Sequence, residues 1–165
     1  MFARRSLTAV LLCALCAGTA QAQEPEYTTI ELEIDINAPA EEVWAKVGGY
    51  CDISSWLPVD CEMTSGNGEM GSVRLLAGGR VIEILVAKTE LSYGYTQPVQ
   101  EGQFYNLYHG FMEARPVTAN TSKMLYTLVY DTSNIEGEAE RQADIDRRRG
   151  MFEGALANIK ALAEE

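Results

Sequence analysis

The sequence predicts an α+β domain in which a curved, seven-stranded antiparallel sheet wraps around one long C-terminal helix. Three observations lead to this prediction. One strand pattern is followed by two short helical patterns, six further strand patterns come next, and a long amphipathic helix closes the chain. Because a single long helix must bury its apolar stripe, the sheet is expected to curve around it.

Residues 1–22 have the pattern of a secretory signal peptide, which is removed before the mature domain folds. Two arginines precede an apolar run over 7–17, and the A-Q-A sequence at 20–22 fits a cleavage site. The run is too short for a bilayer-spanning helix, so no stable membrane anchor is expected. The prediction is therefore a periplasmic or secreted protein of a Gram-negative bacterium, with a single domain over 23–165.

The charge of the chain excludes several classes of partner. The full chain has 13 basic and 24 acidic residues, a formal net charge of −11. Residues 1–22 contain two arginines and no acidic residue, so the predicted mature domain carries −13. This charge repels phosphate backbones and anionic headgroups, which argues against binding nucleic acids or membrane surfaces. Small neutral or apolar molecules remain compatible, and the oligomeric state is not indicated.

The first strand and the two short helices are marked by a change of period. Residues 28–36 alternate between apolar and polar side chains, as in a half-buried strand. Pro39 suits the first position of a helix, and apolar residues recur at helical spacing over 40–47. Two glycines end this helix, and a second short helix over 50–57 ends at Pro58.

Strand and turn patterns continue to residue 131, with glycine-rich turns between them. The predicted strands cover 59–64, 72–77, 80–88, 92–98, 104–114 and 123–131. A final helix is predicted over 136–163. Its apolar face consists of Ile145, Phe152, Leu156, Ile159 and Ala163. Gly150 and Gly154, about one turn apart, either leave space beside this helix or allow it to pack closely against the sheet.

Cys51 and Cys61 are the two cysteines of the predicted mature domain. In an exported protein such a pair is expected to form a disulfide, which would stabilise the fold by about 2–3 kcal/mol. Two buried free thiols are the alternative. No metal site is expected, because the lone His109 and the two cysteines do not form a cluster with ligand spacing.

Four motifs, in this order of elements, resemble the polyketide cyclase/dehydrase branch of the START-like superfamily, also called SRPBCC. They are NAPAEEVW at the first helix, WLP at the end of the second, GSVRLLAGGRVIEIL in the third and fourth strands, and RRRGMFEGALANIKALAEE at the C-terminus. The resemblance covers nearly all of 27–163 and implies a helix-grip fold, with Trp44 and Trp56 in the core. It also implies an internal cavity that accommodates a lipid-like molecule. The superfamily includes carriers, receptors and enzymes, so no single reaction follows.

A two-residue turn at Gly78-Gly79 would bring a cation and an anion directly opposite each other. In this register Arg74 pairs with Glu83, on a face shared with apolar residues of both strands. In the resembling family, an arginine and a glutamate at these strand positions face the cavity. In lachrymatory factor synthase, a member of that family, they resemble a proton-transfer pair.

Three interpretations of this pair remain open. An ordinary ion pair on the outer face of the sheet would contribute only ~0–1 kcal/mol. A buried pair is expensive to desolvate, so chains rarely keep one for stability alone. Inside a cavity, Arg74 and Glu83 would either anchor a polar group of a ligand or act as general acid and base.

The resemblance further implies that Tyr95, Tyr108 and Tyr126 line the cavity, where each gives an apolar ring and one hydroxyl group. Packing in the core is the alternative for each. His109 follows Tyr108 and should point to the opposite face of its strand. The three arginines at 147–149 lie among acidic residues and are interpreted as a solvated helix face with salt bridges.

These observations favour a protein that binds or carries a small hydrophobic molecule, such as a lipid, an isoprenoid or an aromatic compound, without a cofactor. The first alternative is a cyclase, dehydratase or isomerase that uses Arg74 and Glu83 for proton transfer. The second is a non-catalytic periplasmic accessory protein with a fully packed core.

Overall fold

A computed structural model describes residues 24–99 and 107–165. The predicted signal peptide and the first residues of the strand predicted from position 104 lie outside this part of the chain. The described elements are β1 (Tyr27–Ile36), α1 (Ala40–Val47), α2 (Ile53–Trp56), β2 (Cys61–Ser65), β3 (Val73–Leu76), β4 (Val81–Lys88), β5 (Ser92–Thr96), β6 (Tyr108–Pro116), β7 (Ser122–Asp131) and α3 (Glu138–Glu164).

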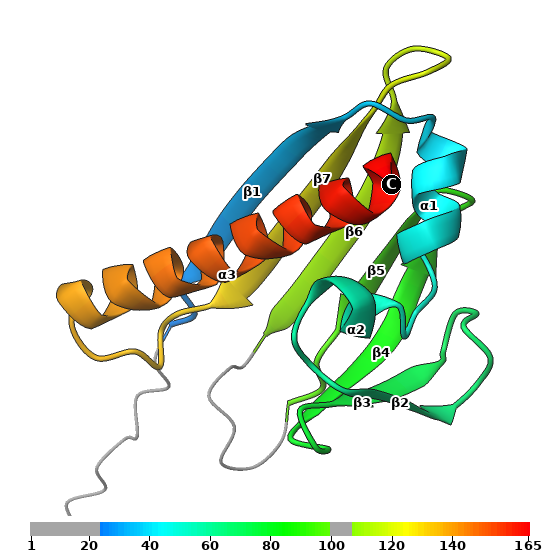
Figure 1. Cartoon of the computed structure of the whole chain (residues 1–165). Helices are drawn as coiled ribbons and strands as arrows, with labels where there is room; N and C mark the ends of the chain where they lie inside the picture. The colour runs from blue at the N-terminus through cyan, green and yellow to red at the C-terminus, as the bar shows by residue number, and fades with distance from the viewer. Residues whose placement is uncertain (1–23, 100–106) are drawn as a thin grey trace, which may run out of the picture.

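The sheet is antiparallel throughout, with the strand order β1-β7-β6-β5-β4-β3-β2. The first strand therefore lies beside the last, and their register runs from Tyr27 opposite Asp131 to Ile36 opposite Ser122. The sheet curves around α3, while α1 and α2 lie towards the β4 side of the same face (Figure 1). The predicted α+β helix-grip fold is confirmed.

The local patterns form the elements that they predict. In β1, Ile30 and Ile36 are buried, whereas the acidic residues between them are exposed. Pro39 precedes α1, and the Gly48 amide donates to the Trp44 carbonyl where the helix ends. The helix predicted over 50–57 is shorter than expected. The Asp52 carboxylate accepts a hydrogen bond from the Gly49 amide, so a turn occupies its predicted first residues.

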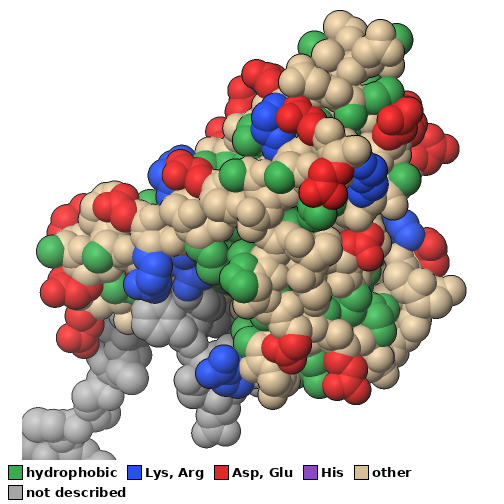
Figure 2. Space-filling view, viewed as in Figure 1, with side chains coloured by type: hydrophobic (Ala, Val, Ile, Leu, Met, Phe, Trp, Pro, Cys, Tyr) green, Lys and Arg blue, Asp and Glu red, His purple; other side chains and the backbone are tan. Residues whose placement is uncertain are grey.

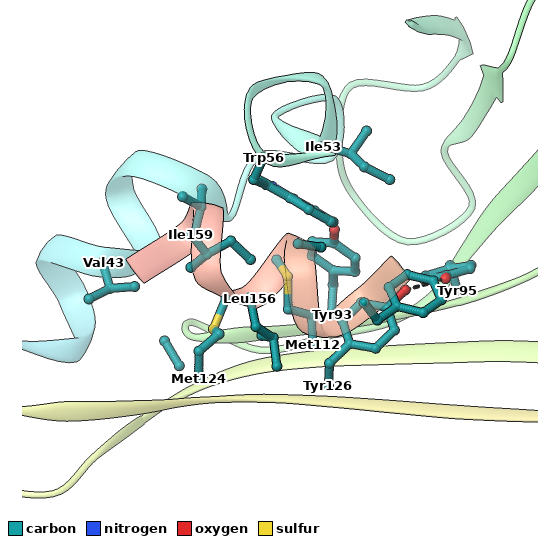
Figure 3. Close-up of a cluster of buried hydrophobic side chains, with 14 of the residues drawn as sticks. Val43, Ile53, Trp56, Tyr93, Tyr95, Met112, Met124, Tyr126, Leu156 and Ile159 are labelled. Carbon is teal, nitrogen blue, oxygen red and sulfur yellow. Dashed lines mark hydrogen bonds between the residues drawn. The ribbon is translucent and has the colours of Figure 1, made fainter. Parts of the chain in front are cut away.

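The core lies between the concave face of the sheet and α3. Leu156 and Ile159 of α3 meet Met112 and Met124 of the sheet in a cluster of buried side chains (Figure 3). Trp56 is buried in this core, as expected. Trp44 is only half-buried at its edge, with its ring centroid 5.7 Å from that of Tyr93.

The disulfide between Cys51 and Cys61 is present, which confirms that prediction and excludes the free thiols. It closes a loop that contains α2.

Close packing against the sheet is the wrong explanation for Gly150 and Gly154 of α3, because a Cβ atom at either position would meet no atom within 4 Å. In the described residues, no helix has the length and hydropathy needed to cross a membrane.

Candidate functional site

The β3–β4 hairpin places Arg74 and Glu83 inside the molecule. Ala77, Gly78 and Gly79 all have positive φ angles, a conformation that glycine adopts without a steric penalty. This turn sets the predicted register, with Arg74 opposite Glu83. The exposed fractions are 0% for Arg74 and 3% for Glu83. An ion pair on the outer face of the sheet is therefore wrong.

The two side chains satisfy each other and their neighbours. Arg74 donates to one oxygen of Glu83 from Nε at 2.8 Å and from Nη2 at 2.6 Å. Its Nη1 donates to the carbonyl oxygen of Tyr50, whose ring centroid lies 4.1 Å from the guanidinium carbon. The second carboxylate oxygen of Glu83 accepts a hydrogen bond from Gln97 at 3.1 Å. The pair is thus desolvated, but its members are well supplied with partners.

Burial changes the proton affinities of the groups around this pair. It raises the pKa of Glu83 above 4.5, while Arg74 and the hydrogen bond from Gln97 oppose the rise. Burial also raises the pKa values of Tyr95 and Tyr108 well above 10. At neutral pH these tyrosines are uncharged, so each hydroxyl can donate one hydrogen bond.

A cavity of about 260 Å³ lies between the sheet, α2 and the middle of α3. Its lining consists of Ile53, Leu57, Val59, Leu76, Val81, Glu83, Tyr95, Gln97, Tyr108, Arg148, Met151 and Phe152. Most of these side chains are apolar, and the polar ones supply a carboxylate, an amide, a guanidinium and two phenols. Such a combination suits a mainly apolar molecule that carries a polar group.

The structure divides the predicted site residues into two layers. Glu83, Tyr95 and Tyr108 line the cavity directly. Arg74 lies behind Glu83, and the Tyr126 hydroxyl lies behind Tyr95, 2.5 Å from its hydroxyl oxygen. The second layer therefore holds the first in place rather than facing the cavity.

Packing across the sheet fixes the orientation of Tyr95. The residue pairs with Gly110 of β6, and a Cβ atom at position 110 would collide with the tyrosine ring. On the other side, Tyr126 stacks on Phe152 of α3, with ring centroids 4.3 Å apart. His109, next to Tyr108, is half-buried on the opposite face, as expected.

The interpretation of residues 147–149 as a solvated face is wrong for Arg148. Its side chain is only 13% exposed, and its Nε donates to Asp144, which is itself buried, at 2.9 Å. The guanidinium carbon lies 5.3 Å from the ring centroid of Tyr108 and 4.9 Å from that of Tyr130. The spacing of the sequence could have indicated this burial, because positions 144, 148 and 152 lie on one helix face and Phe152 belongs to the predicted apolar face.

Gln97 was also missed, although the strand predicted over 92–98 includes it and alternation places it on the same face as Tyr95. In the structure β5 ends one residue before it, at Thr96. A second hollow, of about 400 Å³, lies beside the cavity between α2 and α3. It shares Leu57, Val59 and Met151 with the cavity and also includes Gly154.

Among the described residues, no group of three or more His, Cys, Asp or Glu could hold a metal ion.

The chain that forms this curved sheet, long helix and partly open cavity matches a known family. A family model described as polyketide cyclase / dehydrase and lipid transport matches residues 27–164. The chain belongs to this family. Membership confirms the resemblance to the polyketide cyclase branch of the SRPBCC superfamily, whose fold generally binds small hydrophobic ligands.

Solved structures support the fold of this polyketide cyclase family member. A protein from Nitrosospira multiformis is 24% identical, with a TM-score of 0.65, over 81% of this chain and 94% of its own. The Zhui aromatase/cyclase from Streptomyces is 16% identical, with a TM-score of 0.65, over 84% and 94%. Ara h 8.0201 is 19% identical, with a TM-score of 0.59, over 82% and 99%. No curated protein matches the sequence.

Proposed function

We propose that this protein binds a small, mainly apolar molecule in the 260 Å³ cavity and acts as an exported carrier or binding protein. The cavity carries the proposal, because its walls are apolar apart from a few converging polar groups. Water gains little from such walls, whereas an apolar ligand would bury surface there at about 25 cal/mol per Å². The cavity also argues against the alternative of a fully packed core.

Preorganisation of the polar groups supports this function. Arg74 and Gln97 hold the Glu83 carboxylate, and Tyr126 holds the Tyr95 hydroxyl. A ligand therefore meets groups that need little further ordering, which lowers the entropic cost of binding.

The disulfide and the pattern of residues 1–22 both support export, since disulfides persist in oxidising compartments.

Extraction of the purified protein with organic solvent, followed by mass spectrometry, tests binding. The expected result is a small molecule in stoichiometric amount with the wild type. Val81→Phe should lose it, because Val81 lines the cavity, whereas Ile82→Phe on the other face of the same strand should retain it. Extracts without any bound molecule, or equal loss from both variants, would count against the proposal.

Proton transfer by Glu83 is a second candidate function. The observation that favours it is a carboxylate at the cavity wall whose pKa is raised by burial, which improves it as a base near neutral pH. Glu83→Gln should lower turnover of the extracted molecule by about 10²–10⁴-fold. Full turnover by this variant would eliminate the enzyme hypothesis and leave the binding function intact.

A further inference from the structure

The Glu83 carboxylate at the cavity wall has one hydrogen-bonding position that no residue of 24–99 or 107–165 fills. An ionised carboxylate can accept about four hydrogen bonds. Its Oε2 accepts two from Arg74, and its Oε1 accepts one from Gln97. Gln97 lines the cavity whereas Arg74 does not, so Oε1 is the oxygen on the cavity side. A ligand group that donates one hydrogen bond would complete the set.

The charged groups around the cavity cancel in pairs. Arg74 and Glu83 form one pair, and Arg148 and Asp144 form the other. A charged ligand group would therefore be buried without a compensating charge. Figure 2 shows acidic side chains spread over this face of a chain whose net charge is −11, so an anion is disfavoured on approach as well. An uncharged donor, such as a hydroxyl group, has neither cost.

The second hollow gives the apolar part of such a ligand a path out of the cavity. It shares Leu57, Val59 and Met151 with the cavity. Met151 is 42% exposed at this junction, so a ligand that covered it would bury apolar surface. Further along α3, a Cβ atom at Gly154 would meet nothing within 4 Å, so the missing side chain keeps the hollow open. The cavity and the second hollow together form an elongated site.

We infer that the ligand is an uncharged, elongated alcohol whose hydroxyl group donates to Glu83 and whose apolar chain runs past Met151 to Gly154. This inference rests on the proposed binding function and names its ligand class. The carboxylate supplies the selectivity for the hydroxyl group, because hydrogen bonds to charged groups are stronger than those between neutral groups. The second hollow supplies the selectivity for a long chain over a compact ring system.

Displacement of a bound fluorescent probe, N-phenyl-1-naphthylamine, by compounds with the same chain tests the head group. The compounds are 1-dodecanol, its methyl ether and dodecanoic acid. The wild type should bind the alcohol about tenfold more tightly than the ether, which cannot donate a hydrogen bond. The acid should bind at least as weakly as the ether at neutral pH, because its carboxylate would face Glu83. The double variant Arg74→Met/Glu83→Leu should bind alcohol and ether with similar affinity, and it leaves neither charge unpaired.

The outcomes distinguish the ligand class from the binding function. If the ether or the acid displaces the probe from the wild type as well as the alcohol does, the inference is wrong while the binding function stands. Failure of the wild type to bind the probe or any of the compounds would overturn both. A folded double variant that still prefers the alcohol to the ether would show that Glu83 is not the anchor, which also overturns the inference.

Chain length tests the path along α3 with a matched pair of variants. Gly154→Leu should fill the second hollow and weaken 1-tetradecanol about tenfold, because each methylene group kept out of an apolar site weakens binding about fourfold. The shorter 1-octanol should be little affected. Gly150→Leu is the control, because it adds the same side chain to the same helix at a position outside the hollow. Equal effects of the two variants, or no effect of Gly154→Leu, would refute the proposed path of the chain.

Discussion

Arg74 and Glu83 illustrate how far individual residues could be predicted. Their register was predicted from a two-residue loop at the two glycines. The structure keeps this register, although its turn takes in residues 77–80 and the last strand pair is Leu76 opposite Val81. Their inward direction did not follow, since the other face of the same strands is also partly apolar. Leu75 and Ile82 on that face are half-buried, so the alternation of β3 and β4 gave no clear answer.

Arg148 was missed for a related reason. The charged residues around position 148 are close together in sequence and resemble a solvated helix face. Asp144 and Arg148 nevertheless lie on the buried side of the helix, where Asp144 and two tyrosine rings surround the Arg148 guanidinium. The rings come from β6 and β7. Sequence patterns do not report such contacts between elements that are distant along the chain.

Removing one member of the buried ion pair should be costly. Arg74→Met leaves Glu83 buried without its main partner and should lower the free energy of unfolding by about 3–5 kcal/mol. The double variant Arg74→Met/Glu83→Leu should lose much less than the sum of the two single variants, because no unpaired charge remains. Urea denaturation measures all four proteins. Additive losses would contradict the coupling inferred from the geometry.

The pH dependence of stability should report the state of Glu83. Because burial raises its pKa above 4.5, the folded protein holds this proton to a higher pH than the unfolded chain does. The stability from this group is therefore complete below about pH 4.5 and is lost as the pH rises through the native pKa.

Relative to Glu83→Gln, the wild type should thus lose unfolding free energy with rising pH, by at most about 1.4 kcal/mol per pH unit. Urea denaturation of both proteins from about pH 4 to about pH 8 gives the difference. A difference that instead increases with pH would mean that Arg74 dominates and that the pKa is lowered.

At the scale of elements, the disulfide and α2 act together. The loop that Cys51 and Cys61 close carries Ile53, Leu57 and Val59, three of the residues that line the cavity. Tyr50, which covers the Arg74 guanidinium, directly precedes this loop. The disulfide thus restrains one wall of the candidate site as well as the fold.

Loss of the disulfide should weaken both stability and binding. The double variant Cys51→Ala/Cys61→Ala should unfold with about 2–3 kcal/mol less free energy, because its unfolded chain is less restrained. Its affinity for an apolar probe should also fall, since the wall formed by α2 becomes more mobile. Denaturation and probe titration measure the two effects. Unchanged affinity in a folded variant would show that the loop wall does not depend on the bridge.

Element boundaries were less predictable than element types. The alternating run of β1 is a strong periodic pattern, and the buried apolar residues of α3 lie in its C-terminal half, from Phe152 to Ala163. Both elements lie where they were expected. The helix expected over 50–57 is shortened to Ile53–Trp56, because the residues before it form a turn in which the Asp52 amide donates to the Gly49 carbonyl. Local hydrogen bonds of this kind change boundaries without changing the hydrophobic pattern.

At the scale of the whole molecule, the order of elements was sufficient to predict a sheet that curves around the last helix. Seven strands share one helix, which covers only the concave side, and β1 completes the sheet beside β7 (Figure 1). The cavity was expected only from the family resemblance. Its size depends on how α2, α3 and the sheet fit together, which periodicity within each element does not determine.

Methyl NMR during titration with N-phenyl-1-naphthylamine tests the hollow interior most directly, because neighbouring residues on β3 and β4 serve as internal controls. The methyl signals of Leu76 and Val81, which line the cavity, should shift with saturation at one probe per chain. Those of Leu75 and Ile82, paired on the outer face, should stay nearly unchanged. Shifts confined to the outer-face pair, or no shift at either pair, would contradict a ligand-binding cavity.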